Sequence, residues 1–161
     1  MDFAQVVADN QSLVFSFALR FLRDREGAEE LAQDVFLQLF EKLRQIESPA
    51  HATWWLRRAI CHRCIDEARK RRLRPRVGLE SAPEPSVETT EPDPLLHDRL
   101  QSLIAELPEN ARTIMLLRYQ EDLGPSDIAG ILDIPVSTVK SHLHRSLTML
   151  RGRLQKQEVC R

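Results

Sequence analysis

The segment from Leu123 to Leu154 most constrains how this chain can fold, because its last part has two opposed faces. Apolar residues recur there at spacings of three and four, which on an α-helix form one inward stripe: Val139, Leu143, Leu147, Leu150 and Leu154. The opposite face would carry Ser137, Lys140, Ser141, His144, Arg145, Thr148 and Arg151. Residues 135–156 contain five Lys or Arg and no Asp or Glu. Such a helix suits a groove lined with phosphates, although a solvated amphipathic helix has the same pattern.

A shorter helix is predicted just before this one. Its apolar face would consist of Ile128, Ala129, Ile131 and Leu132, and Ser126 is a candidate N-cap. The run Asp133-Ile134-Pro135 would end it, and proline suits the start of the next helix because its φ is locked. Two short helices joined by a three- or four-residue turn match a helix-turn-helix in size and order.

Charge is distributed in blocks, although the net charge is only −1. Residues 24–41 have a net charge of −5, residues 57–76 of +7, and residues 77–98 of −6. Separate blocks of opposite sign indicate distinct surfaces with distinct partners.

A proline-rich segment divides the chain. Residues 75–94 contain five of the nine prolines together with Ser, Thr and Glu, a composition that cannot bury a core. We therefore predict a domain over residues 1–74, a flexible acidic linker over 75–94 and a second domain over 95–161. Neither side shows strand alternation, so both domains are predicted to be all-α. The second would begin with a helix bearing Leu96, Leu100, Leu103, Ile104 and Leu107, stopped by Pro108 and followed by a helix from Glu109 to Tyr119.

In the first domain, one amphipathic helix is particularly clear. The predicted core stripe is Ala28, Leu31, Ala32, Val35, Phe36, Leu39, Phe40 and Leu43. The opposite face would carry Glu30, Gln33, Asp34, Leu37, Gln38 and Glu41. Leu37 is an apolar residue among acids and amides there, so it is either an ordinary exposed leucine or the centre of a partner site.

Aromatic and basic residues share the next predicted helix, from Trp54 to Arg72. Aromatic rings stack on unpaired bases while arginines contact the backbone, which is the combination that single-stranded DNA requires. Because adjacent helical residues point about 100° apart, we expect one of Trp54 and Trp55 to be buried and the other to lie near the surface. The preceding loop, residues 46–52, could hold an extruded base.

Several function classes are disfavoured. No apolar run approaches the roughly 18 residues of a membrane helix, no signal peptide is recognisable, and a cytoplasmic location is expected. Cys61 and Cys64 are predicted to be buried small residues rather than metal or redox ligands, because no second ligand pair is evident. No phosphate loop or hydrolase motif occurs, so we predict neither an enzyme nor a cofactor. Nothing indicates a homodimer.

With these motifs in place, the chain resembles the extracytoplasmic-function (ECF, group 4) sigma factors of bacterial RNA polymerase. The first domain carries the resemblance in the run from Ala28 to Phe36 and in Trp55-Leu56-Arg57-Arg58 followed by Ile65-Asp66. The second carries it in Leu107-Pro108-Glu109, Leu116-Leu117-Arg118-Tyr119, Asp127-Ile128-Ala129 and the run from Val139 to Arg145. Each string is weak alone, but their order across two domains is specific.

The resemblance implies a role for each surface. The acidic helix face, Glu30, Gln33, Asp34, Leu37, Gln38 and Glu41, would dock on the clamp helices of the polymerase largest subunit. The −10 element would be opened by Trp54, Trp55, Arg57, Arg58, His62, Arg63, Arg69 and Arg72, with His62 where many members carry asparagine. The −35 element would be contacted by Ser137, Lys140, Ser141, His144 and Arg145, with Arg112 and Arg118 as nearby phosphate contacts. An anti-sigma factor is a further possible partner.

Two other functions fit parts of the sequence. A stand-alone helix-turn-helix regulator would bind duplex DNA without polymerase and would be indifferent to Asp34→Lys. A sigma mimic that sequesters an anti-sigma factor can dispense with DNA-contacting residues, whereas this chain retains them.

Overall fold

The computed structural model describes residues 1–74 and 94–159, with side chains up to Lys156. The chain divides into two compact units at Glu84/Pro85, and we call their described parts the N-terminal unit (1–74) and the C-terminal unit (94–159). Apart from Pro94, the predicted linker lies outside the described residues. Both described ranges contain helices and no strand, which confirms the all-α prediction. None of these helices combines the length and apolar character of a membrane span.

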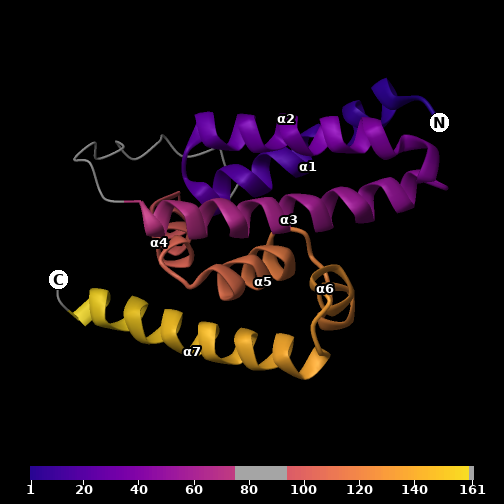
Figure 1. Ribbon diagram of the computed structural model, residues 1–161. Coiled ribbons are helices and arrows are strands. Elements are labelled where there is room, and N and C mark those ends of the chain that lie inside the picture. The colour runs from indigo at the N-terminus through magenta and orange to yellow at the C-terminus, as the bar shows by residue number, and fades with distance from the viewer. Residues whose placement is uncertain (75–93, 160–161) are drawn as a thin grey trace. The chain divides into compact units, whose positions relative to one another are not determined.

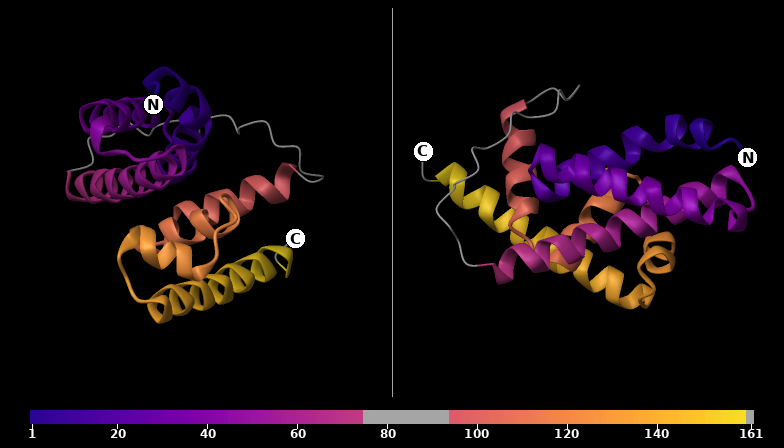
Figure 2. Two further views of the ribbon diagram at one scale, coloured as in Figure 1. Left: turned by 90° about the vertical axis from the view of Figure 1, so that its right-hand side faces the viewer. Right: turned by 45° about the horizontal axis from the view of Figure 1, so that its top comes forward.

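The N-terminal unit is a bundle of three helices (Figures 1 and 2). Its elements are α1 (Phe3–Leu22), α2 (Arg25–Lys42), the 3-10 turn η1 (Leu43–Gln45) and α3 (Pro49–Leu73). A side chain in the first half of α1, Asn10, contacts the start of α3, and Asp24, just before α2, contacts the end of α3. Helix α3 therefore runs parallel to α1 and antiparallel to α2.

Local sequence signals set the limits of these helices. Asp2 caps α1 by accepting a hydrogen bond from the Ala4 N–H at 3.2 Å. Ser48 caps α3 in the same way through the His51 N–H at 3.1 Å, and Pro49 occupies the first turn. Arg23 ends α1 in the left-handed conformation, with φ at 56°.

The core of the N-terminal unit is aliphatic and aromatic, and its largest buried side chains are Val14, Phe17, Phe21, Val35, Leu39, Leu56 and Ile60. Cys61 and Cys64 are completely buried, as predicted for small apolar residues. The predicted core position of Phe40 is wrong, because its side chain is 60% exposed. Periodicity located the stripe on α2 but overestimated its width, since Phe40 lies at the stripe's edge and packs on the Phe3 ring.

The C-terminal unit consists of α4 (Pro94–Ala105), α5 (Glu109–Tyr119), α6 (Pro125–Leu132) and α7 (Val136–Val159). The bounds of α5 are those predicted. Helix α4 ends before Pro108, and of its predicted apolar stripe Leu103, Ile104 and Leu107 are buried while Leu96 is exposed. Helices α5 and α6 both pack on α7 and so form the support for its inner face.

Helices α6 and α7 form the predicted helix-turn-helix. Asp133 ends α6 in the left-handed conformation, with φ at 56°, and the Ile134 N–H donates to the Ala129 carbonyl at 3.1 Å. The predicted Ser126 cap is wrong, because α6 begins at Pro125 with Gly124 at the N-cap. Proline's locked φ starts the helix early and places Ser126 within its first turn.

Candidate nucleic-acid interface

One face of α7 is exposed along its whole predicted length. Its seven residues, which we call the basic face, are all exposed: Ser137, Lys140, Ser141, His144, Arg145, Thr148 and Arg151. On the opposite side Val139 and Leu150 are buried, and Leu143, Leu147 and Leu154 are half-buried. The two-faced geometry predicted from the sequence is therefore confirmed.

The centre of the basic face is an open hollow lined by Lys140, Ser141, His144 and Arg145. The Arg145 Nε donates to the Ser141 carbonyl at 3.3 Å, one turn earlier on the same helix. Within residues 1–74 and 94–156, its terminal guanidinium nitrogens have no hydrogen-bond or ion-pair partner, so they can act as the bidentate donor that recognises guanine or phosphate. His142 lies beside this face, where burial and the Arg145 charge lower its pKa.

The two arginines expected to contact phosphates on α5 are already partly engaged. The Arg112 Nη2 donates to the Leu107 carbonyl at 3.0 Å, so this side chain also links the α4–α5 turn to α5. Arg118 lies 3.6 Å from Asp122 and over the Tyr119 ring at 5.5 Å. Asp122 is almost fully exposed, and such a surface pair is weak enough to be exchanged for a phosphate.

The two tryptophans of α3 differ less than predicted. The expectation that one would be buried is wrong, because Trp54 is 42% exposed and Trp55 is half-buried. A cation lies over each ring: Arg58 at 5.7 Å from the Trp54 centroid and Lys42 at 5.8 Å from the Trp55 centroid. The inward stripe of α3 is formed instead by Ala52, Leu56, Ile60 and Cys64, one residue every four.

The basic residues of α3 differ in what they contact. His62, Arg69 and Arg72 are exposed on the helix surface. Arg63 instead bonds Asp34 on α2 at 2.7 Å, and Arg71 bonds Asp24 at 2.6 Å. These two ion pairs were not predicted, because nothing along the sequence indicates which distant carboxylate a given arginine meets.

The pKa of His62 is lowered by burial and by the Arg58 charge, which outweigh the opposing effect of Asp66. The lowered pKa favours the neutral imidazole, which presents one hydrogen-bond donor and one acceptor rather than a charge.

The predicted docking face of α2 is largely exposed. Glu30, Gln33, Leu37, Gln38 and Glu41 are exposed, and Asp34 is half-buried against Arg63. Leu37 is 63% exposed, and Phe40 lies one turn further along α2, edge-on to Phe3 at 5.1 Å between ring centroids. Phe40, which the sequence pattern had assigned to the core, thus extends the apolar centre of this face together with Phe3.

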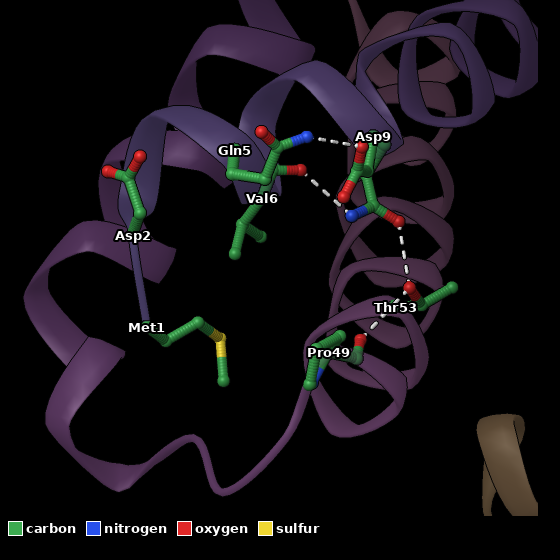
Figure 3. Close-up of a pocket in the computed structure, with 8 residues that line it drawn as sticks. Met1, Asp2, Gln5, Val6, Asp9, Pro49 and Thr53 are labelled. Atoms are coloured by element: carbon green, nitrogen blue, oxygen red, sulfur yellow. Dashed lines mark hydrogen bonds between the residues drawn. The ribbon is translucent and has the colours of Figure 1, made fainter.

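The loop expected to hold an extruded base is short, because α3 already begins at Pro49. A cavity of about 170 Å³ opens beside the start of α3 (Figure 3), where Pro49 and Thr53 line it. Inside it, the Thr53 hydroxyl donates to the Asn10 Oδ1 at 2.9 Å, while the Asn10 amide donates to the Val6 carbonyl. Asp2 and Asp9 also line the cavity, so it does not suit a phosphate.

Among the residues that the structure describes, no three His, Cys, Asp or Glu side chains gather into a possible metal site. Cys160 lies outside the described residues.

These features define a DNA-binding protein with a supported recognition helix in one unit and a separate helical bundle in the other. Comparison with known families identifies both. The Sigma-70 region 2 model matches residues 6–74, and the Sigma-70 region 4 model matches residues 97–150. Together they span the two units.

Individual relatives agree with the family models. The chain is 28% identical to the ECF RNA polymerase sigma factor SigW of Bacillus subtilis, over 95% of this chain and 89% of that protein. It is also 28% identical to the probable RNA polymerase sigma factor RfaY of Xanthomonas campestris, over 94% of this chain but only 40% of the relative.

A solved structure has the same fold. The sigma factor RpoE of Bartonella quintana, in complex with the anti-sigma factor NepR, superimposes with a TM-score of 0.76 at 20% identity, over 96% of this chain and 97% of that one. The chain thus belongs to the ECF family of RNA polymerase sigma factors. It binds core RNA polymerase and directs promoter-specific initiation of transcription, and the two alternative functions are not favoured.

Proposed function

We propose that the two units divide promoter recognition between them. Residues 1–74 would dock on core polymerase and open the −10 element, residues 95–161 would read the −35 element, and residues 75–94 would link them. The observation that carries this proposal is the basic face of α7: all seven polar side chains are exposed, and the apolar stripe behind them is packed. A helix supported in this way is ready to enter a major groove.

At the −35 element, Lys140, Ser141, His144 and Arg145 would face the base edges. Arginine offers the bidentate donor geometry that distinguishes guanine, and the hydroxyl of serine can donate or accept. Ser137 lies one turn earlier on the same face. Arg118 would exchange its exposed Asp122 partner for a phosphate, whereas Arg112 would act mainly by stabilising the α4–α5 turn.

At the −10 element, the outward-facing stripe of α3 would contact the unpaired strand. Trp54, Arg58, His62 and Arg69 follow one another at spacings of four, four and seven, which places them on one side of the helix. Unstacking paired bases costs a few kcal/mol, and each base stacked on an aromatic ring returns about 1–3 kcal/mol. Arg57 and Arg72 would add charge, Trp55 would support the stripe, and Arg63 would act through Asp34.

The docking face of α2 fits a partner that is both basic and apolar. Carboxylates at Glu30 and Glu41 surround the exposed Leu37, and apolar centres ringed by polar groups are typical of binding hot spots. The clamp helices of polymerase are the proposed partner, and Phe40 would enlarge the contact. We further propose that the chain is a specificity subunit rather than a catalyst, acts in the cytoplasm, and is regulated by an anti-sigma factor, as the complex of the Bartonella neighbour suggests.

Run-off transcription tests this assignment. The full chain is mixed with core polymerase and DNA fragments carrying promoters of genes induced by its overexpression. We expect transcripts of defined length only when chain, core and promoter are all present. Absence of any promoter-directed transcript would contradict the proposal, and specific, tight binding to duplex DNA without core would favour a stand-alone regulator.

A further inference from the structure

The end of α3 carries the arginines proposed to bind DNA, but it buries no apolar side chain against the rest of the unit. Every residue from Arg69 to Arg74 is exposed, and Leu73 is 80% exposed. Helix ends that bury no apolar surface fray, because most helical stability in proteins comes from tertiary packing. The proposed −10 contacts Arg69 and Arg72 therefore lie on a segment that must be held in another way.

Arg71 makes such a tertiary contact. Its Nη2 bonds the Asp24 Oδ2 at 2.6 Å, and its Nε bonds the Glu67 Oε1 at 3.1 Å. Asp24 is the N-cap residue of α2 and directly follows Arg23, the C-cap residue of α1. A single guanidinium thus connects the last turns of α3 to the α1–α2 turn, which lies beside them (Figure 1).

Gly27 provides the space for this contact. A Cβ added at this buried position would lie 2.5 Å from the Arg71 Nη2 and 2.6 Å from the Asp24 Oδ2. Both distances are shorter than any real Cβ contact, and both partners are side-chain tips that can move away. Alanine at position 27 would therefore force at least one of these tips to move, which disturbs the ion pair without removing either charge. The φ of Gly27 is not positive, so the backbone tolerates alanine.

The electrostatics of the pair agree with its geometry. Burial alone would raise the pKa of Asp24, but its hydrogen bond with Arg71 and the charge of Arg71 lower it. The pKa of Arg71 is raised, because Asp24 and Glu67 outweigh the effect of burial.

We propose that the Asp24–Arg71 bridge, seated over Gly27, positions the basic end of α3 for the −10 DNA, and that Arg71 is a positioning residue rather than a DNA contact. This inference rests on the proposed role of α3 at the −10 element. It separates Arg71 from its neighbours Arg69 and Arg72, which the sequence alone presents as equivalent members of one basic run.

The test uses holoenzyme with the full chain and measures the rate of strand opening at the −10 element by permanganate reactivity of unpaired thymines. The variants are Gly27→Ala, Asp24→Asn and Arg71→Ala. The matched control is Gly152→Ala, where an added Cβ meets nothing within 4 Å. We expect each of the three to slow opening about fivefold, with unchanged affinity for core, and the control to behave as the wild type.

The salt dependence of promoter binding distinguishes positioning from contact. A lost phosphate contact reduces the slope of log K against log salt by about one. Positioning predicts an unchanged slope for all three variants. A reduced slope for Arg71→Ala, or wild-type opening by Gly27→Ala and Asp24→Asn, would overturn the inference. Because Gly27→Ala keeps every charge, it carries the test even if Arg71→Ala unfolds. If the wild type itself opens no promoter, the proposed function fails instead.

Discussion

Neighbouring arginines in this chain differ in role, because some bond a carboxylate of the same unit and others remain exposed to solvent. Arg63 and Arg71 are neutralised by carboxylates on or next to α2, at 2.7 and 2.6 Å, while Arg69 remains exposed. An arginine bonded within its own unit has less to gain from a phosphate, because it must first release its partner. The total charge of a basic run therefore overstates the charge available to DNA.

Arg145 is the residue of the basic face for which the prediction is sharpest. Arg145→Ala should weaken binding of the holoenzyme to its −35 element by about 1–3 kcal/mol if the side chain reads a base edge. Affinities for the wild-type element and for elements changed one base pair at a time measure this. Arg153→Ala is the matched control, because Arg153 lies on the same helix but pairs with Glu106. An equal loss on every sequence would make Arg145 a phosphate contact.

Asp24 gives a prediction about pH. Its pKa in the folded protein lies below the ordinary value of 3.8. A lowered carboxyl pKa stabilises the fold above that ordinary value, and the stabilisation is lost as pH falls through the folded value. The free energy of unfolding, measured by chemical denaturation, should therefore be higher for the wild type than for Asp24→Asn by a constant amount from pH 7 to about pH 5. The difference should disappear below pH 3.8. A difference independent of pH would contradict this.

Among the secondary-structure elements, the sequence predicted best the helices whose apolar residues recur at regular spacings. The start of α5 was predicted from the stop at Pro108, and the two faces of α7 were predicted because apolar residues recur there at regular spacings. Two errors lie where tertiary contacts decide, because Phe40 rests on Phe3 and the tryptophans of α3 lie beside cations. The third is local, since Pro125 starts α6 before Ser126. Of the candidate site, the exposure of the basic face of α7 was predictable, whereas the ion pairs of Arg63 and Arg71 with distant carboxylates were not.

The helix-turn-helix depends on the left-handed residue between α6 and α7. Asp133 has a φ of 56° and a ψ of 50°, a conformation that aspartate tolerates and β-branched residues avoid. Asp133→Val should lower the free energy of unfolding by about 1–2 kcal/mol, whereas Asp133→Gly should be neutral or stabilising. Urea titration of both variants measures this. Equal stabilities would mean that the turn relaxes into another conformation.

The docking face of α2 is best probed at Leu37. Its side chain is 63% exposed, so Leu37→Asp should leave the fold intact and weaken binding to core by about 2 kcal/mol or more. Asp34→Lys is a poorer probe, because it would also break the bond to Arg63. Leu73→Asp, the same change at an exposed leucine on α3, is the control. Unchanged core affinity of Leu37→Asp in a fluorescence competition assay would refute the docking face.

On the scale of the whole molecule, a net charge of −1 conceals surfaces of opposite sign. The acidic block at 24–41 forms α2, and the basic block at 57–76 covers most of α3. Each unit has its own buried core and its own exposed basic residues, on α3 in the N-terminal unit and on α7 in the C-terminal unit. A sigma factor built in this way can recognise two promoter elements through two independent sets of contacts.

Independence of the two units is itself testable. Effects of substitutions that share no partner add to within about 0.5 kcal/mol. Arg69→Ala on α3 and Arg145→Ala on α7 should therefore weaken formation of the open complex additively in the double variant, measured with holoenzyme on one promoter. Arg145→Ala combined with Lys140→Ala, within one basic face, is the comparison that should deviate from additivity, because the two side chains line the same hollow. If the coupling energy between Arg69 and Arg145 were as large as that between Arg145 and Lys140, the two units would not act separately. Recognition of one promoter element would then depend on contacts with the other.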